Sequence, residues 1–390
     1  MGGVSMEWKE VRLGEVADVQ TGPFGSQLHK ENYVNKGTPI VTVEHLGNKW
    51  FTSQNLPMVS DEDKLRLAKY CSQEGDVIFS RVGSVDRCSY VSKEYSGWLF
   101  SGRCLRVRPR SGINPEYLYY FLTNEGTKQY IRNIAVGATM PSINTKLLNE
   151  VPITIPSLDD QHRIASILSS LDRKIELNNK INADLEEMAQ AIFKNWFVDF
   201  EPFKDGKFVD SELGMIPEGW KIGCLGDIAE ITSGKRPPKK SKDKTKELFI
   251  PLIGASDIMG FTSDVLYERP ILVIGRVGTH GVVQRFQEKC WPSDNTLVIE
   301  SSYYNYVYQL LKGIDYSAIN RGSTQPLITQ TDVKNTDVII APENVLKEYE
   351  SITSTLFSKH RANIKENSRL STLRDTLLPR LMSGELEVPE

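Results

Sequence analysis

Two long stretches of the chain place apolar residues at heptad spacing. In the first, Ile164, Leu171, Asn178, Leu185 and Ile192 lie seven residues apart, and Leu168, Ile175, Asn182, Ala189 and Trp196 each follow four residues later. The second repeats the pattern with Tyr349, Leu356, Asn363, Leu370 and Leu377, and with His360 and Asn367 at the later position. Such an a/d seam predicts two long coiled-coil helices.

Four asparagines interrupt these apolar seams at matching places. Asn178 and Asn182 coincide with Asn363 and Asn367 after a shift of 185 positions. A buried asparagine in a seam costs stability but fixes register, because a slipped partner would leave its amide unpaired. We therefore expect the two helices to pair with each other, antiparallel. The alternative is that each helix packs separately on its own globular domain.

The rest of the chain carries short apolar runs broken by Gly, Pro, Asn and Ser. Strands are predicted at 77–79, 104–107, 151–155, 271–274, 296–299 and 338–340. One helix is expected in each half, at 115–122 and 303–311. Short strands with few helices predict an α+β fold with curved antiparallel or mixed sheets.

The order of these features occurs twice along the chain. The segment from Trp8 to Gly22 returns 212 positions later as the segment from Trp220 to Gly234. The Arg81-Val82-Gly83 tripeptide returns 195 positions later, and Gly137–Ile143 returns 185 positions later. The sequence therefore predicts a pseudo-two-fold internal repeat with equivalent surfaces. We expect globular domains at 1–155 and 220–342, long helices at 156–200 and 343–390, and a connector at 201–219.

Composition is that of a globular protein, and charge becomes informative only when it is divided by segment. The 390 residues carry a net charge of −3, but residues 1–155 and 220–342 are each +2. Basic residues concentrate at 234–246, with seven cations against one acid, and at Arg103, Arg106, Arg108 and Arg110. Local fields of this sign attract a polyanion. The alternative is two solvated loops or strand faces.

Cysteine usage and hydropathy place the chain in a reducing compartment. The five cysteines are scattered and form no CxxC pair, so we expect neither a zinc site nor a disulfide framework. No apolar run is long enough to span a bilayer. The expected localisation is the cytoplasm, with no membrane association.

The sequence contains no recognisable catalytic motif. The sequence has no P-loop, no dinucleotide fingerprint after a strand and no HExxH. The glycines at 275, 278 and 281 are explained by a tight turn after a strand. We therefore expect a non-catalytic binding protein with no cofactor and no metal site.

Loop residues that recur in both halves are the candidate binding residues. Arg81 and Arg276 each end a predicted strand, where an arginine reaches guanine or a phosphate, or else forms an internal salt bridge. Polar loop residues are able to read base edges, although they equally suit turns. The full candidate set is Gln27, Arg81, Ser142, Asn144, Lys146, Lys235, Arg236, Arg276, Thr279, Thr324 and Gln325.

These residues and motifs resemble the DNA specificity subunits of type I restriction–modification systems, nearly from end to end. The segments on which this resemblance rests are 8–22 and 220–234, 21–26, 137–143 with 322–328, 192–200 and 377–386. The two helix-end segments, Ile192–Phe200 and Leu377–Leu386, are the most specific. The second copy departs from the pattern because it lacks the Phe-Gly-Ser-Gln loop at 24–27.

The resemblance implies two target recognition domains separated by the helix pair, each reading half of a bipartite site in double-stranded DNA. It also implies that methyltransferase subunits dock on the helices and supply S-adenosylmethionine, and that a motor-nuclease subunit joins the complex. A helix of about 35 residues is about 50 Å long, which exceeds the ~34 Å between successive major grooves. The rival hypotheses are a non-catalytic protein-interaction scaffold and a fused methyltransferase–specificity enzyme.

Overall fold

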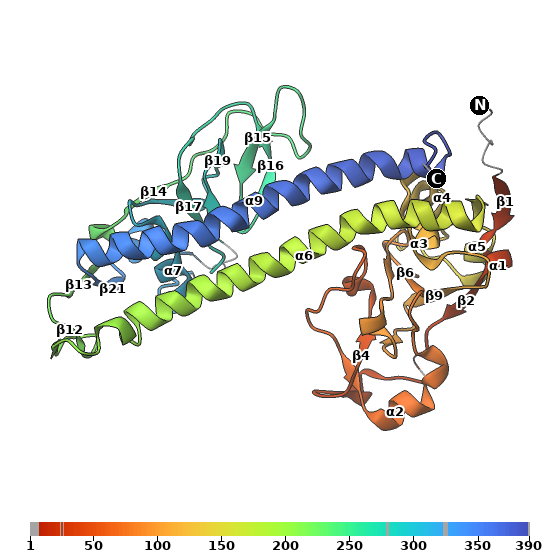
Figure 1. The fold of residues 1–390 in the computed structure, drawn as a ribbon, viewed down its shortest axis with the longest axis horizontal. Helices are drawn as coiled ribbons and strands as arrows, with labels where there is room; N and C mark the ends of the chain where they lie inside the picture. Colours follow the sequence, from red (N-terminus) through yellow and green to blue (C-terminus); the bar gives the residue numbers. More distant parts are fainter. Residues whose placement is uncertain (1–7, 24, 26, 278–280, 323–326, 389–390) are drawn as a thin grey trace. The chain divides into compact units, whose positions relative to one another are not determined.

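Two long helices dominate the structure, a computed structural model that describes residues 8–388 except Phe24, Ser26, 278–280 and 323–326. The helices are α6 (Leu158–Phe197) and α9 (Glu343–Met382), each of 40 residues (Figure 1). The chain divides into two compact units, and both helices contribute to each unit. Unit 1 comprises Met1–Asn178 and Ile364–Glu390, and unit 2 comprises Asn179–Asn363. The two helices predicted from the heptads are confirmed.

Unit 1 combines short strands with short helices. Its strands are β1 (Lys9–Arg12), β2 (Ala17–Thr21), β3 (Tyr33–Val34), β4 (Thr38–Val41), β5 (Met58–Val59), β6 (Val77–Ser80), β7 (Cys88–Tyr90), β8 (Leu99–Phe100), β9 (Cys104–Pro109) and β10 (Pro152–Ile155). Its short helices are α1 (Leu13–Val16), α2 (Asp61–Arg66), α3 (Pro115–Thr123), α4 (Glu125–Ile134) and α5 (Thr145–Asn149).

A four-stranded sheet of order β2-β9-β6-β7 separates two apolar cores in unit 1. Successive side chains of a strand point to opposite faces. Val77 and Phe79 of β6 therefore enter one core with α3 and α6, whereas Ile78 enters the other with β4 and β8. Burial on both faces explains why Val77–Phe79 of β6 form a continuous apolar run, which was predictable from sequence.

Unit 2 repeats this plan. Its strands are β11 (Phe208–Val209), β12 (Ile216–Pro217), β13 (Lys221–Cys224), β14 (Glu230–Ser233), β15 (Ile250–Ile253), β16 (Ile258–Thr262), β17 (Ile271–Gly275), β18 (Gln284–Phe286), β19 (Trp291–Pro292), β20 (Thr296–Glu300) and β21 (Asp337–Ile340). Its short helices are α7 (Tyr304–Gly313) and α8 (Gln330–Lys334). The sheet order β14-β20-β17-β18 matches that of unit 1, and β17 again divides its side chains between two cores.

The expectation of one short helix per half was too low. Unit 1 adds α4, whose sequence is largely polar and which buries only Thr127 and Ile131. A ten-residue helix of this kind contains no apolar run of the sort that marks a buried element in the sequence. No helix in the described part of the chain combines the length and apolarity needed to cross a membrane.

Within each unit, the α6 and α9 segments run antiparallel and contact through their asparagines. In unit 1, Nδ2 of Asn178 donates to Oδ1 of Asn367 over 2.8 Å and to Glu366 over 2.7 Å. In unit 2, Nδ2 of Asn363 donates to Oδ1 of Asn182 over 2.9 Å. Asn178 and Asn363 are each only 1% exposed, and their Nδ2 groups make these bonds away from water, whereas Oδ1 of Asn178 has no hydrogen-bond partner among the described residues.

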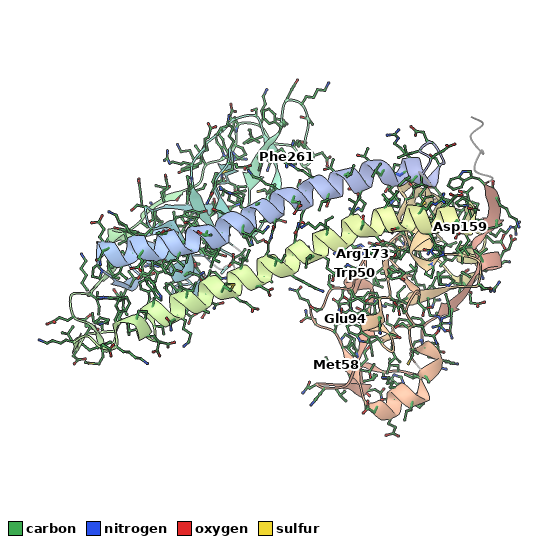
Figure 2. The ribbon with its side chains drawn as sticks, in the orientation of Figure 1. Trp50, Met58, Glu94, Asp159, Arg173 and Phe261 are labelled. Carbon is green, nitrogen blue, oxygen red and sulfur yellow. The ribbon has the colours of Figure 1, made fainter. Side chains whose placement is uncertain are left out.

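A buried ionic network joins the recognition part of unit 1 to both helices. The Lys49 ammonium lies 2.8 Å from Glu116 and 4.0 Å from Asp172 of α6. It also lies 5.0 Å from the ring centre of Trp50, the residue labelled in Figure 2. The Tyr120 hydroxyl donates to Asp172 over 2.5 Å, and Arg374 of α9 donates to the same carboxylate over 2.7 Å. Burial lowers the pKa of Lys49, although Glu116 opposes the shift.

The C-terminal ends of the two long helices each meet a tryptophan of the repeat. In unit 1, Gly384 has φ +73°, and a Cβ there would lie 2.6 Å from Nε1 of Trp8. In unit 2, the Trp220 ring lies 5.7 Å from Phe197, 5.4 Å from Phe200 and 5.0 Å from Phe203. These contacts explain why Trp8, Trp220 and the helix-end motifs occur together in the sequence.

We predict that Asp172→Ala lowers the free energy of unfolding of unit 1 by about 3 kcal/mol, because it leaves Lys49 buried with one carboxylate fewer. Denaturant unfolding followed by Trp fluorescence measures the change, since Trp50 lies beside Lys49. Asp159→Ala is the matched control, because Asp159 is exposed in the first turn of α6. Equal stability of the two variants would contradict the proposed contribution of the network.

Candidate nucleic-acid interface

The loops predicted to bind DNA rest on the same backbone frame in both units. The Arg81 amide donates to the Arg103 carbonyl over 2.8 Å, and the Arg276 amide donates to the Asn295 carbonyl over 2.9 Å. The Ile143 amide donates to the Arg81 carbonyl over 2.9 Å, and the Ile328 amide to the Arg276 carbonyl over 3.0 Å. These paired bonds bring together loops that are far apart in sequence.

Two glycines make this frame possible. A Cβ at Gly22 would overlap the carbonyl oxygen of Ser101, and a Cβ at Gly234 would overlap that of Ser293. The Gly22 amide donates to Cys104 over 3.1 Å, and the Gly234 amide to Thr296 over 3.0 Å. The repeated glycine at the end of the Trp8–Gly22 segment is therefore required by close backbone approach.

Most of the DNA-binding residues predicted in the first copy form hydrogen bonds to other groups of the protein. Oε1 of Gln27 accepts from the Tyr70 hydroxyl over 2.8 Å. Arg81 donates to the Gly102 carbonyl over 3.3 Å, and Ser142 donates to the Val136 carbonyl over 3.1 Å. Asn144 caps α5 by accepting from the Leu147 amide over 2.9 Å. Each has a structural partner.

The alternating arginines at the end of β9 do not form a basic surface. Arg106 is only 7% exposed, and its Nε lies 4.0 Å from the buried carboxylate of Asp76. Arg108 donates to both oxygens of Asp76 over 2.7 Å, and Arg110 pairs with Asp18 at 2.6 Å. Burial lowers the pKa of Arg106, whereas the hydrogen bonds to Asp76 raise that of Arg108. The expectation of a polyanion-attracting cluster therefore fails for three of the four arginines.

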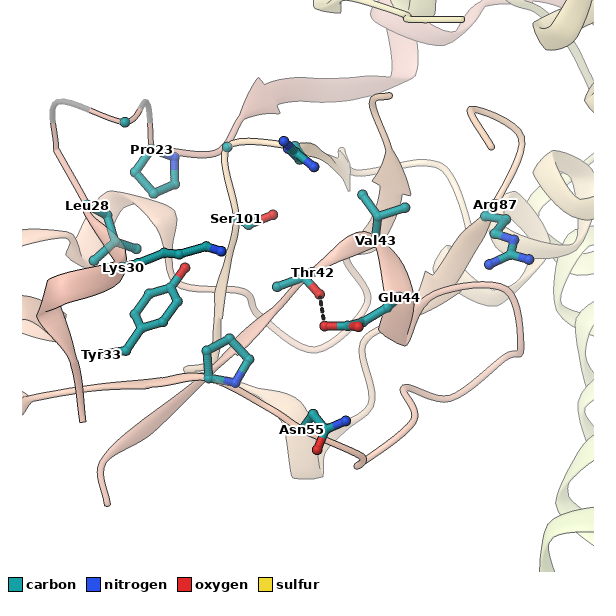
Figure 3. A pocket seen from close by; sticks show the side chains of 14 residues that line it. Pro23, Leu28, Lys30, Tyr33, Thr42, Val43, Glu44, Asn55, Arg87 and Ser101 are labelled. Carbon is teal, nitrogen blue, oxygen red and sulfur yellow. Dashed lines mark hydrogen bonds between the residues drawn. The ribbon is translucent and has the colours of Figure 1, made fainter. Parts of the chain in front are cut away.

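An open hollow of about 950 Å³ lies in unit 1 near the remaining arginine, Arg103 (Figure 3). We call it the first hollow. Its lining includes Pro23, Lys30, Tyr33, Glu44, Arg87 and Arg103. The residues Lys30, Glu44 and Arg87 were not among those predicted. They are single charges in polar loops, so neither spacing nor periodicity marks them in the sequence.

The basic run at 234–246 of unit 2 is exposed, as a DNA-contacting segment needs to be. All seven of its cations are exposed, and no ion pair joins them to another described residue: Lys235, Arg236, Lys239, Lys240, Lys242, Lys244 and Lys246. The run is fixed at its base, where the Lys235 amide donates to Pro292 over 3.0 Å and Trp291 donates to the Lys235 carbonyl over 2.7 Å.

Arg276 and Lys146 differ in their surroundings. Nε of Arg276 is buried and has no hydrogen-bond partner within the described residues. Lys146 is exposed on α5. Thr279, Thr324 and Gln325, the other predicted readers of the second copy, lie outside the residues that the structure describes.

Comparison with known proteins decides the family. The family model for the type I restriction modification DNA specificity domain matches residues 6–187 and 217–369. The chain belongs to this family. The two matches coincide with the two copies of the repeat, and the sequence-based assignment to a specificity subunit rather than a scaffold is confirmed.

Individual relatives extend over the whole chain. The MjaIX specificity subunit of Methanocaldococcus jannaschii is 29% identical and aligns with 100% of this chain and 96% of its own length. The HindI specificity subunit of Haemophilus influenzae is 24% identical, with coverage of 97% and 100%. The crystal structure of the type I S subunit from M. genitalium superposes with a TM-score of 0.62 at 17% identity, covering 100% and 98%. This last similarity confirms the fold class.

We predict that Arg108→Ala destabilises the specificity subunit by about 3 kcal/mol, because it removes the close partner of a buried carboxylate. Arg110→Ala is the matched control, since Arg110 and Asp18 are both exposed, and little change in stability is expected. Thermal unfolding measures the difference. If both variants retained the wild-type stability but lost DNA affinity equally, the structural assignment of these arginines would be wrong.

Proposed function

We propose that this chain is the DNA-recognition subunit of a type I restriction–modification complex and that each copy of the repeat reads one half of a bipartite target. It supplies recognition, whereas methyltransferase and motor-nuclease subunits supply catalysis. The chain needs no cofactor of its own, and the proposed location is the cytoplasm. We assign the recognition domains to 1–155 and 220–342, the spacer helices to 156–200 and 343–390, and the connector to 201–219.

The observation that carries this proposal is a repeated backbone frame with unlike loops. Both copies share the sheet order and the glycine contacts at Gly22 and Gly234. Between β14 and β15 the second copy has the exposed basic run, whereas the first copy has a hollow with charges of both signs. Because the two copies share one backbone frame, they can be placed on a DNA duplex in equivalent ways. Because their loops differ, they can recognise two different half-site sequences.

The basic run is suited to phosphates rather than bases. Its cations are exposed, close in sequence and without acidic partners among the described residues. Such groups neutralise backbone phosphates and give affinity without sequence information. Arg276, whose Nε has no hydrogen-bond partner among the described residues, is the proposed base reader of the second copy.

The long helices also carry apolar side chains that suit a partner subunit. Met188 and Leu373, which are 185 positions apart and therefore equivalent in the repeat, are both about half exposed. Leu177 and Ile364 are similarly exposed in unit 1. Contiguous exposed apolar patches mark protein interfaces, and we propose that these side chains contribute to such patches. Methyltransferase subunits are the proposed occupants, one for each copy.

We predict that the double substitution Lys239→Gln/Lys240→Gln weakens DNA binding by the assembled complex and lowers its salt dependence. Loss of two phosphate contacts would reduce the slope of log K against log salt by about 2. The preferred sequence should not change. Fluorescence anisotropy over a salt series measures both quantities.

Two contrasts make this test specific. Lys207→Gln/Lys221→Gln removes the same charge from exposed sites outside the run and should leave the slope unaltered. Arg276→Ala should instead weaken binding to one half-site or relax its sequence. An unchanged slope in the Lys239/Lys240 variant would remove the basic run from the interface.

The helix pair is proposed to set the spacing between the half-sites, with the asparagines fixing its register. We predict that four residues inserted after Lys180 and four after Lys365 lengthen the accepted spacer by about two base pairs, because four helical residues add about 6 Å and a base pair rises about 3.4 Å. Both insertions lie between the two asparagine pairs, so each pair is kept.

Sequencing of methylated positions in DNA modified by the variant complex measures the spacer. An insertion in α6 alone is the control, and it should impair the complex because the two asparagine pairs can no longer form together. A doubly inserted complex that methylates only the original spacing would contradict the ruler role.

A further inference from the structure

Glu44 and Arg87 occupy a distinctive place in unit 1, because both border two separate hollows. The first hollow contains them together with Lys30 and Arg103. A second hollow, of about 570 Å³, contains them together with Gly47, Asn48 and Lys128. Glu44 and Arg87 thus lie between two concavities, each of which also has a cation in its lining.

Glu44 is presented by a rigid turn. It is the middle residue of the 3-10 turn Val43–His45, which directly follows β4. The Thr42 amide donates to Nδ1 of His45 over 3.0 Å, so Nε2 carries the ring hydrogen and donates to the Gln54 carbonyl over 2.9 Å. His45 is buried, and its two hydrogen bonds fix the turn. The Glu44 side chain nevertheless remains 66% exposed.

Arg87 is presented by a second rigid segment that is tied to the first. Its carbonyl accepts from the Ser80 amide over 2.9 Å, and its amide donates to Ser84 over 3.1 Å. Its stem passes Gly47, where a Cβ would lie 3.5 Å from Cδ of Arg87. Ser89 links the segments, since its hydroxyl donates to the Asn48 carbonyl over 2.6 Å and accepts from the Gly47 amide over 3.3 Å.

Glu44 and Arg87 are available to bind a ligand. Most other arginines of this domain are instead paired with carboxylates. Arg12, Arg66, Arg106, Arg108, Arg110 and Arg132 all have carboxylate partners. Within the described part of unit 1, Arg87 has none within 4 Å. The Glu44 carboxylate accepts from the Thr42 hydroxyl over 3.2 Å, as drawn in Figure 3, and lies 3.9 Å from Nε2 of His45. The two side chains do not pair with each other.

A carboxylate without a lysine or arginine partner on a DNA-binding surface points to a base rather than to the backbone. Phosphates repel it, but the N4 amino group of cytosine donates to it in the major groove. An arginine beside it donates to O6 and N7 of guanine, the partner of cytosine. We propose that Glu44 and Arg87 together read one C·G base pair of the half-site bound by the first recognition domain. This inference rests on the proposed function.

The second copy lacks this pair, as recognition of unlike half-sites requires. β4 and β15 are equivalent because Val41 pairs with Phe100 of β8 and Ile253 pairs with Pro292 of β19, both in parallel. Ser256 then corresponds to Glu44, since each is three residues beyond its strand. Val282 corresponds to Arg87, each being six residues after the shared arginine at 81 or 276. Neither Ser256 nor Val282 carries charge, so the C·G preference belongs to the first copy alone.

The test uses the full chain in complex with its methyltransferase. The wild-type target is first mapped by sequencing methylated positions, and duplexes with every single base-pair change are then measured by anisotropy. Arg87→Ala should weaken binding to the wild-type duplex by about 5- to 150-fold and abolish discrimination at one guanine. Glu44→Gln should weaken the preference for this C·G pair, because a neutral amide oxygen accepts from the cytosine N4 amino group less strongly than a carboxylate does. No switch to an A·T pair is expected, since it would remove the guanine that Arg87 reads.

Matched controls separate base reading from charge and stability. Lys93→Ala and Glu94→Gln change exposed residues of the same domain outside both hollows, and Glu94 is labelled in Figure 2. Both control variants should keep the wild-type preference and affinity. Thermal unfolding of all four variants should match the wild type, since neither Glu44 nor Arg87 is buried.

Three outcomes would overturn the inference while leaving the proposed function intact. These are unchanged preference in both variants, effects in different half-sites, and a uniform loss of affinity with a reduced salt slope, which would place Arg87 on a phosphate. If the wild-type complex itself shows no bipartite preference, the proposed function fails instead.

Discussion

The close approach of backbone segments at Gly22 and Gly234 is the constraint on which each recognition domain depends. At both sites a side chain would collide with a carbonyl of the neighbouring segment, so the end of the first sheet strand is locked against the turn that precedes the next strand. The same turn receives the backbone bonds of Arg81 or Arg276. Because the frame is made by main-chain groups, the side chains on the loops are free to differ between copies.

Ion pairing then separates arginines that build the domain from those that are available to a ligand. Asp76 is 1% exposed and lies beneath β9, so it requires the guanidinium of Arg108 and the nearby charge of Arg106. Removing an acid of this kind from water is costly unless cations surround it. An arginine-rich strand is therefore explained by one buried carboxylate, and the local net charge of the sequence overstates the positive surface.

This distinction explains what the sequence could and could not predict. β6, β17 and β20 were predictable because both faces of their sheets are buried, so each strand contains a continuous apolar run. The long helices were predictable because heptads extend over 40 residues. The pairing of Arg108 with Asp76, 32 residues away, was not, since no local pattern links them. Glu44 and Arg87 were missed for the same reason: only the folded chain brings their two turns together.

Each unit contains a buried cation near the contact between its recognition domain and α6, although the cation differs between the two copies. In unit 1, Lys49 is enclosed by aromatic rings and reaches Asp172 of α6 through Tyr120. In unit 2, Arg285 lies over the rings of Tyr304, Tyr308 and Phe357, and Tyr308 donates to Glu186 of α6. Burial lowers the pKa of both cations. Lys49 lies in the connection between β4 and β5, whereas Arg285 lies on β18, so the common feature is the tyrosine that bonds to a helix carboxylate. A tyrosine hydroxyl needs such an acceptor when it is buried. The bond therefore specifies how each recognition domain meets α6, independently of which cation lies beneath it.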